Sequence, residues 1–468
     1  MKEEIVMLGT SRNIVDDWIK MGKTELIMYK IKEIVKNDPL LYVTPDTYAF
    51  FVKTREMDEH QNLKKETDFI NQIEIDIKNS ERVSIYLHYP LCETPLCKFC
   101  HYIKLSANKK NKLIMELLAQ EIDKFIEKVP SINGKEISSL YIGGGTPSLM
   151  NENDIKSIFY VLKGLNISMD CEKTIEATPK TLTDENIAIL TNYFNRISVG
   201  IQTLNSDILK KMHRSSSDKK MILDNLHKLL YVSNKKSIIT NIDLIYGFPS
   251  QDSESLINDI SELLNINGGP SSFTLYRLRL KRVGEDISEL MKDYEKDPKS
   301  FPDQFETYRM KVLATDFLKK NGYKEGPIGW FSKNASPKVY SDRWSSGVPL
   351  IGFGIGAYSY TDNVQYRNIK DPDLYRYYVN LRNELPISTA AFLDDEMQLK
   401  KKISFYLKQM QNIELDVQTK TIFADLIDRK GLFNIKDNKL NLTEVGSLMV
   451  EEIISGYIWK DVKIFFSH

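Results

Sequence analysis

The stretch "VSIYLHYPLCETPLCKFC", residues 83–100, joins a β-rich run to a loop that holds three of the four cysteines of the chain. The run ends at Pro90, and Cys92, Cys97 and Cys100 follow directly after it. Branched and aromatic residues favour a strand over the run. This order of strand and loop is the first unit of a pattern that recurs along the chain.

Strand and helix patterns alternate from residue 83 to residue 280. Helical stretches with one apolar face, such as "KLIMELLAQEIDKFIEKV", separate the strand-like runs. About six repeats of this kind are typical of βαβ units with a parallel sheet. The sequence therefore predicts an α/β fold. The later strand-like runs are "ISSLYI" (137–142), "KTIEAT" (173–178), "RISVGI" (196–201), "SIITNIDLIYG" (237–247) and "SFTLYRLRL" (272–280).

Three loops with unusual composition each follow a predicted strand. They are the cysteine loop, "GGGTPS" at 143–148 and "GIQTLN" at 200–205. In parallel sheets the loops after the strands gather at one edge, where ligands bind. We expect the functional site at that edge.

The composition limits the class of protein. The chain has 468 residues, of which 42% are hydrophobic and 27% charged, as expected for a globular protein of two or three domains. Lys+Arg and Asp+Glu are both 64, so no net charge favours nucleic acid as a partner. No apolar run is long enough for a membrane span, and the first residues do not resemble a signal peptide. We expect a cytoplasmic protein.

The chain divides into three predicted segments. Residues 1–82 form an N-terminal helical extension, residues 83–385 the core, and residues 386–468 a small C-terminal domain. Helices and a short hairpin, "FNIKDNKLNLT", give the last segment a winged-helix outline. It lacks a basic recognition stripe, so we expect a packing or lid module and no DNA binding.

The cysteine cluster is predicted to bind metal, because disulfides are rare in a reducing compartment. A structural zinc site needs four ligands, and only His101 stands near Cys92, Cys97 and Cys100. A cubane iron–sulfur cluster takes one external ligand per iron, so three thiolates leave one iron open for a small molecule. The cluster is favoured and zinc remains the alternative. We expect Cys171 to be an ordinary thiol.

Polar residues accompany the other loops. Glu176 and Gln202 fall near strand ends, and Asp243 lies in an otherwise apolar strand, where a carboxylate needs a partner. The glycines at 143–145 let backbone groups approach a ligand closely. For each residue alone, a capped turn or a paired core carboxylate is an equally good explanation. Their joint appearance favours a site.

Six motifs in this order resemble the oxygen-independent coproporphyrinogen III oxidase group of the radical S-adenosylmethionine (SAM) enzymes. The resemblance covers residues 83–465 and implies a partial (β/α)6 barrel. The motifs are "SIYLHYPLCETPLCKFC", "LYIGGGTPSLM", "TIEATPKTL", "RISVGIQTLNSDILKKMHR", "NIDLIYGFPSQ" and "LIGFGIGAYSYTDNVQYRNIKDPDLY".

The resemblance implies a [4Fe–4S] cluster on Cys92, Cys97 and Cys100, with SAM bound to the fourth iron. Reduction of the cluster would cleave SAM to a 5′-deoxyadenosyl radical, so a flavodoxin- or ferredoxin-like electron donor is implied. In parts of the family the substrate side, here near 275–280 and 354–357, holds a second SAM. By the same resemblance, Tyr86 and Phe99 pack near the cluster and SAM. The methionine end of SAM is bound by Gly144, Gly145 and Thr146. The charged and ribose groups of SAM are held by Glu176, Gln202, Arg214 and Asp243.

The chain departs from the family pattern in three places. The first cysteine spacing is C-x4-C where the family has C-x3-C, so one residue must bulge from the loop. Of a family "HN–YW" stretch only Trp344 remains, in "KVYSDRW". The aromatic N-terminal arm is at most echoed in "LLYVTPDTYAFF", residues 40–51. The radical-generating part is thus expected to be intact and the substrate side to have diverged.

Three functions remain open from the sequence. The first is a coproporphyrinogen dehydrogenase-like radical SAM oxidoreductase acting on a tetrapyrrole or another small molecule, including a specialised methyltransferase or haem-breakdown enzyme. The second is a haem-binding chaperone of the same family. The third is a zinc-bound structural descendant. No protein side chain is assigned a catalytic role beyond holding cluster and SAM.

Overall fold

The computed structural model describes most of the chain. Trp344 and nearly all of residues 40–51, which carry two of the predicted departures, lie outside the described residues. The described residues are 22–38, 41, 55–56, 62–107, 111–214, 218–280, 287–333, 337–338, 342, 347–382, 384–427 and 431–459.

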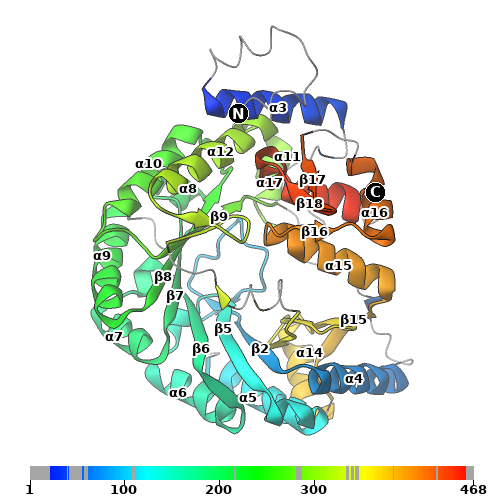
Figure 1. The fold of residues 1–468 in the computed structure, drawn as a ribbon. Coiled ribbons are helices and arrows are strands. Elements are labelled where there is room, and N and C mark those ends of the chain that lie inside the picture. The colour runs from blue at the N-terminus through cyan, green and yellow to red at the C-terminus, as the bar shows by residue number, and fades with distance from the viewer. Residues whose placement is uncertain are drawn as a thin grey trace.

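Six parallel strands stand side by side in chain order and form the centre of the molecule. The helices between consecutive strands lie on the outside of the curved sheet, as Figure 1 shows. This arrangement confirms the predicted partial (β/α)6 barrel. The strands are β2 (Arg82–Tyr89), β5 (Glu136–Gly144), β6 (Asn166–Ala177), β7 (Arg196–Gln202), β8 (Ile239–Tyr246) and β9 (Ser272–Arg277). The main outer helices are α5 (Asn111–Lys128), α6 (Glu152–Val161), α7 (Asp184–Tyr193), α9 (Lys219–Lys236), α10 (Ser253–Leu264) and α12 (Gln304–Lys320).

The sheet continues beyond both ends of the barrel. β12 (Leu350–Phe353) pairs in parallel with β2, although far from it in sequence. Next to β12 the strands become antiparallel, and on the other side β11 and β10 extend the sheet from β9. The added strands are β13 (Tyr358–Tyr360), β14 (Val364–Asn368), β15 (Ile387–Phe392) and β1 (Arg55–Glu56) on one side, and β11 (Trp330–Ser332) and β10 (Lys324–Glu325) on the other.

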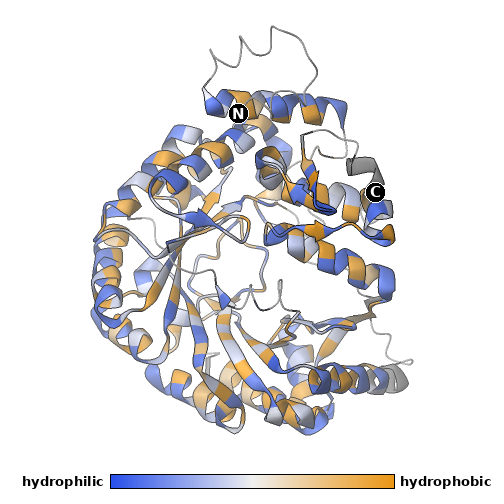
Figure 2. Ribbon diagram, viewed as in Figure 1, coloured by the Kyte–Doolittle hydropathy of each residue, from blue (hydrophilic) through white to orange (hydrophobic). Residues whose placement is uncertain are grey.

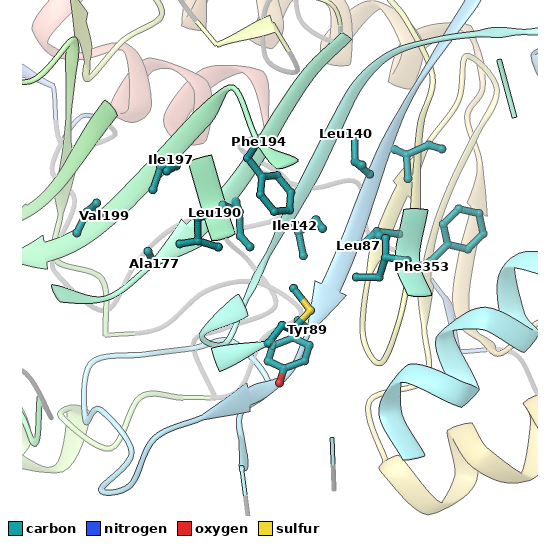
Figure 3. Close-up of a cluster of buried hydrophobic side chains, with 14 of the residues drawn as sticks. Leu87, Tyr89, Leu140, Ile142, Ala177, Leu190, Phe194, Ile197, Val199 and Phe353 are labelled. Carbon is teal, nitrogen blue, oxygen red and sulfur yellow. The ribbon is translucent and has the colours of Figure 1, made fainter. Parts of the chain in front are cut away.

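The two faces of the barrel sheet differ in polarity. The outward side chains are apolar and pack against the helices; Figure 3 shows Ile197 and Val199 of β7 in the same cluster as Leu190 and Phe194 from α7 and its end. The inward positions are largely polar, and the register places Tyr86, Tyr141, Thr174 and Arg196 side by side. Parallel strands covered on both faces are usually apolar throughout. The polar inner face is therefore suited to a polar ligand.

The helices show the complementary pattern. In Figure 2 the hydrophobic residues of the outer helices alternate with hydrophilic ones, as expected for helices with one face on the sheet and one in water. Among the described helices, none is both long and apolar enough for a membrane crossing.

The C-terminal part contains the predicted helices and hairpin, and it shares a hydrophobic core with the N-terminal helix α3 (Lys23–Asn37). Tyr457 also donates a hydrogen bond to Asp38, just after α3. β15 belongs to the main sheet although it begins after residue 386. The three-segment division stays a prediction. The C-terminal elements are α15 (Asp395–Lys408), β16 (Ile413–Glu414), α16 (Val417–Ile427), β17 (Phe433–Lys436), β18 (Lys439–Leu442), α17 (Glu444–Leu448) and α18 (Val450–Ile453).

Candidate cluster and cofactor site

The cysteine loop is closed at its base by backbone hydrogen bonds. Cys92 ends the short strand β3 (Leu91–Cys92), which pairs with β4 (Leu105–Ser106) on the far side of the loop. The amide of Leu105 donates to Pro90 at 2.8 Å, and that of Ala107 donates to Cys92 at 3.0 Å. Both ends of the loop are therefore fixed at the end of β2, and all three thiols are free and partly exposed.

Phe99 anchors the middle of the loop. It is buried against Phe248, with ring centroids 5.5 Å apart, in an apolar cluster that also contacts Cys97 and Cys100. The amide of Lys98 donates to the carbonyl of Met212 at 3.1 Å, just after α8 (Ser206–Lys211). The predicted aromatic residue next to Cys100 thus packs the loop, across the mouth of the barrel, against the segments that follow β7 and β8.

The longer first spacing does not leave the loop unsupported. Glu93, inside the C-x4-C segment, forms an ion pair with Lys180 at 3.1 Å. Lys180 lies in a short 3-10 helix, Pro179–Thr181, directly after β6. The extra residue is therefore accommodated while the loop stays attached to the barrel edge.

Cys92 and Cys100 share one electrostatic environment. Burial raises the pKa of Cys92 to about 12, and the neighbouring Cys100 and Cys97 add to the shift, while a hydrogen bond from Thr146 opposes it. Burial likewise raises the pKa of Cys100. Thiolates in such a place need positive charge close by, which a bound metal cluster provides.

Arg214 supplies protein positive charge at the same place. Its Nη1 donates to the sulfur of Cys97 at 3.7 Å, and its Nη2 donates to the carbonyl of Gly200. Its Nε is buried without a hydrogen-bond partner. This unused buried donor beside the thiols is available to an acceptor group of a ligand.

The donor set fits an iron–sulfur cluster. Three thiols with positive charge beside them match a cubane held by three cysteines with one iron left for another ligand. Within the described residues, no three His, Cys, Asp or Glu side chains are grouped to hold one metal ion.

The glycine loop packs directly on the entrance to the cysteine loop. Gly144 has a φ of +111°, and a Cβ there would lie 2.6 Å from the ring of His88. A Cβ on Gly145 would lie 2.5 Å from the carbonyl oxygen of Leu91. The amides of Gly145 and Thr146 donate to Tyr89 at 2.7 Å and Leu91 at 2.8 Å. These glycines are thus required by packing within the protein, whatever they contribute to a ligand.

Glu176 lies next to the glycine loop. It accepts hydrogen bonds from the Tyr141 hydroxyl at 2.8 Å and from the Gly144 amide at 3.0 Å. Burial, together with the charge of Asp243, raises the pKa of Glu176 to about 7 against the opposing effect of both hydrogen bonds. Because burial disfavours the ionised form of this carboxyl group, a positively charged ligand group beside it would be a good partner.

Asp243 has protein partners of its own. It accepts from the Ser198 hydroxyl at 2.8 Å and from the Asn241 amide at 2.9 Å, and burial raises its pKa. The structure therefore agrees with the alternative interpretation of Asp243 as a carboxylate paired within the core. Asp243 is nevertheless partly exposed on the inner face of the barrel, so a ligand hydroxyl can also reach its carboxylate.

Gln202 occupies a left-handed backbone conformation, with φ +73°, at a register shift near the end of β7. A Cβ on Gly200 would lie 2.7 Å from its amide nitrogen and 3.1 Å from Arg214. Non-glycine residues with such a φ are uncommon and are often found at functional sites. The structure thus brings Gln202, Gly200, Arg214 and Cys97 together at one edge.

His88 is a site residue that sequence reasoning missed. It is buried, its Nδ1 lies 3.0 Å from the hydroxyl of Tyr86, and its Nε2 has no hydrogen-bond partner. Burial lowers the pKa of His88 to about 4, so the ring is neutral. The sequence did contain a signal for this residue: His88 comes two residues after Tyr86, so both side chains lie on the same face of the strand.

Comparison with known proteins agrees with this geometry. Residues 86–260 match the family model described as the radical SAM superfamily. The matched segment contains the three cysteines, the glycine loop and all the predicted SAM-contacting residues.

The relatives by sequence include both haem chaperones and porphyrinogen oxidases. The chain is 34% identical over 281 residues to the heme chaperone HemW of Buchnera aphidicola subsp. Acyrthosiphon pisum, covering 59% of this chain and 69% of that protein. It is 25% identical to HemW of Lactococcus lactis, covering 81% and 98%. It is 24% identical to the oxygen-independent coproporphyrinogen III oxidase of Escherichia coli, covering 79% and 84%.

A solved structure has the same fold. Coproporphyrinogen III oxidase (HemN) from Escherichia coli, described as a radical SAM enzyme, superposes with a TM-score of 0.71 at 20% identity. The match covers 88% of this chain and 96% of that one, so it extends beyond the barrel.

Proposed function

This chain belongs to the radical SAM superfamily, together with the coproporphyrinogen III oxidases and the HemW proteins, and on that basis we propose that it is a radical enzyme acting on a tetrapyrrole. The superfamily uses a [4Fe–4S] cluster and SAM. The observation that carries the proposal is the meeting of Arg214 and Cys97 at the edge where the glycine loop and Glu176 also lie.

Each side chain has a proposed task at this edge. Cys92, Cys97 and Cys100 hold the cluster, and Arg214 offers its free Nε to the carboxylate of SAM. Glu176 accepts from the ammonium group of SAM. Gln202 and Asp243 accept from the ribose hydroxyls, while Gly144, Gly145 and Thr146 line the methionine end. When bound and reduced, a [4Fe–4S] cluster would supply the electron for the cleavage of SAM.

A haem-binding chaperone is the second candidate. The relatives that favour it are named heme chaperones, and one of them is 34% identical to this chain. The same cluster and SAM residues serve both candidates. They differ in whether SAM is consumed.

The first test is metal content. Anaerobically reconstituted protein should contain about four irons and absorb broadly in the visible. Changing Cys92, Cys97 or Cys100 to Ala should remove the iron and the absorption. Cys171→Ala is the matched control, because Cys171 is fully buried on β6 away from the loop, and it should retain both. Stoichiometric zinc without iron in the wild-type protein would refute the cluster.

The second measurement separates the two candidates. With dithionite, or with a flavodoxin- or ferredoxin-like donor, the enzyme should convert SAM to 5′-deoxyadenosine. A protein that carries its irons, binds haem and leaves SAM intact is the chaperone.

A further inference from the structure

The turn after β7 is fixed from outside the barrel by one carboxylate. Asp259 lies on α10, one of the helices on the outside of the curved sheet (Figure 1), and it is buried. Its Oδ2 accepts a hydrogen bond from the Thr203 hydroxyl at 2.6 Å and another from the Leu204 amide at 3.0 Å. Thr203 and Leu204 are buried as well, so water does not replace this acceptor. Asp259 therefore holds the two residues that directly follow Gln202 in the chain.

Gln202 depends on this hold because its backbone is strained. A φ of +73° places it in the left-handed region, which a residue other than glycine occupies only where surrounding contacts enforce it. On one side, Gln202 pairs with Leu244 of β8, just after a shift in register. On the other side, the enforcing contacts are the two hydrogen bonds to Asp259. Without this acceptor, the backbone of Gln202 is free to relax to an extended conformation.

The backbone conformation of Gln202 decides where its side chain lies. A Cβ on Gly200 would lie 2.7 Å from the amide nitrogen of Gln202 and 3.1 Å from the guanidinium of Arg214. Arg214 in turn contacts the sulfur of Cys97 at 3.7 Å. Rotation about the N–Cα bond of Gln202 moves its Cβ, and the side-chain amide would then leave this position beside Gly200.

The same turn begins α8. The Thr203 hydroxyl accepts from the Asn205 amide at 3.2 Å, and the Asn205 side chain in turn caps α8. Just after α8, the carbonyl of Met212 accepts from the amide of Lys98 in the cysteine loop. The cysteine loop is closed independently at β3 and β4, so a displaced turn should affect the cofactor position before it affects cluster binding.

Asp259 contributes to this turn as a hydrogen-bond acceptor. Burial raises the pKa of Asp259, and the hydrogen bonds from Thr203 and Leu204 oppose this shift. Both bonds end at the same oxygen, Oδ2, so a neutral side chain with one acceptor oxygen in that place can receive them.

We propose that Asp259 is a positioning residue for cofactor binding. By holding Thr203 and Leu204, it keeps Gln202 in the left-handed conformation that places its side-chain amide beside Gly200. Asp259 acts from the outer helix layer through these neighbours. The inference rests on the proposed role of Gln202 in SAM binding.

The test measures SAM affinity by calorimetry on anaerobic, reconstituted protein. Asp259→Leu keeps the branched shape of the side chain but removes the acceptor, and it should weaken SAM binding about tenfold with the iron content unchanged. Asp259→Asn keeps one acceptor oxygen and should bind SAM like the wild-type protein. Equal weakening by both variants would assign the effect to the buried charge and contradict the inference.

A double-mutant cycle shows whether Asp259 acts through Gln202. Gln202→Gly removes the side chain, and glycine adopts the left-handed conformation without strain. This change should weaken SAM binding by itself. Adding Asp259→Leu should weaken the binding no further, because effects that act through one group do not add. Two effects that multiply in full would mean that Asp259 acts by another route and would overturn the inference.

Asp76 offers a matched control at the other end of the sheet. On α4 (Asn62–Asn79), it accepts from the Thr361 hydroxyl and from the Asn363 amide at 2.9 Å, the same two kinds of donor. Thr361 follows β13 at the end of the sheet where β12 begins, away from the cysteine loop. Asp76→Leu should lower the melting temperature as Asp259→Leu does and leave SAM affinity unchanged. An equal loss of SAM affinity in both variants would reduce the effect to lost stability and refute the inference.

A second variant covers the case in which Asp259→Leu does not fold. Thr203→Val removes the hydroxyl from the other side of the same contact and leaves the Leu204 bond, so SAM binding should weaken about threefold. Wild-type SAM affinity in folded Asp259→Leu, or in Thr203→Val, would overturn the inference while leaving the proposed function. Wild-type protein that holds its irons and does not bind SAM would refute the proposed function, and the inference with it.

Discussion

Glu176 shows how a single residue acquires its properties from the barrel. The strand β6 points it inward, where burial outweighs two hydrogen bonds and raises its pKa to about 7. Asp243, on the same face, adds to the shift. A raised carboxyl pKa costs stability as pH increases from the unfolded value of about 4.5 toward 7. A positively charged ligand recovers that cost by favouring the carboxylate.

SAM binding should therefore depend on pH through Glu176. The ammonium of SAM needs the ionised carboxyl, so affinity should be about five- to tenfold weaker at pH 6 than at pH 7.5. Calorimetry on the reconstituted protein measures this, together with the proton released on binding. Glu176→Gln should bind more weakly and lose the pH dependence, and Tyr141→Phe should move its midpoint upward because one hydrogen bond is lost. An unchanged pH profile in Glu176→Gln contradicts the assignment.

At the scale of elements, the last barrel strand is joined to a C-terminal helix by charge. Arg277 of β9 and Glu452 of α18 form a buried ion pair at 2.5 Å. Arg279 forms an ion pair with Glu451. Burial alone would raise the pKa of Glu451, but the positive charges of Arg279, Lys311 and Lys408 hold this pKa below its usual value. The carbonyl of Arg279 also contacts His101, beside Cys100. The C-terminal helix is thus connected to the cluster loop through two contacts.

Glu452→Gln should destabilise the protein strongly. The change leaves Arg277 buried without its counter-charge, which typically costs about 3–5 kcal/mol. Replacing both partners, as Arg277→Met with Glu452→Leu, should cost much less because no charge stays buried. Urea unfolding of the two variants makes the comparison. A double variant as unstable as the single one would show that the pair stabilises the protein by more than charge compensation.

At the scale of the whole molecule, the described residues form two large hydrophobic cores. One fills the space between the barrel strands and the outer helices. The other joins α3 near the N-terminus to α12 and the C-terminal helices. Helix α3 and the C-terminal helices therefore depend on each other for burial of apolar surface.

Ile31→Ala should reveal this dependence. Ile31 is fully buried on α3, and truncation of such a side chain costs about 2–5 kcal/mol. Hydrogen exchange should speed up over the C-terminal helices while β2 to β9 keep their protection. Ile85→Ala, equally buried on β2, is the matched variant in the other core and should show the opposite pattern. Uniform loss of protection in both variants would mean that the cores unfold together.

The local sequence pattern was sufficient to predict the strands and helices of the barrel and much of the sheet edge that carries the candidate site. Alternating strand and helix periods predicted the six parallel strands, and the loops after them held the cysteines and the glycines. Gln202 lies at the end of its strand and Glu176 close to the end of another, as predicted, whereas β5 extends into the predicted glycine loop as far as Gly144. These features depend on neighbouring residues in the chain, which is why the sequence alone determines them.

Contacts between distant segments were decided only by the tertiary structure. The insertion of β12 beside β2, the protein partners of Asp243, and the union of α3 with the C-terminal helices join residues far apart in sequence. The raised pKa of Glu176 and the neutral His88 likewise arise from burial among such residues. Periodicity records which face of an element is apolar, but not which element covers it. Desolvation, register and close packing exist only once the chain has folded.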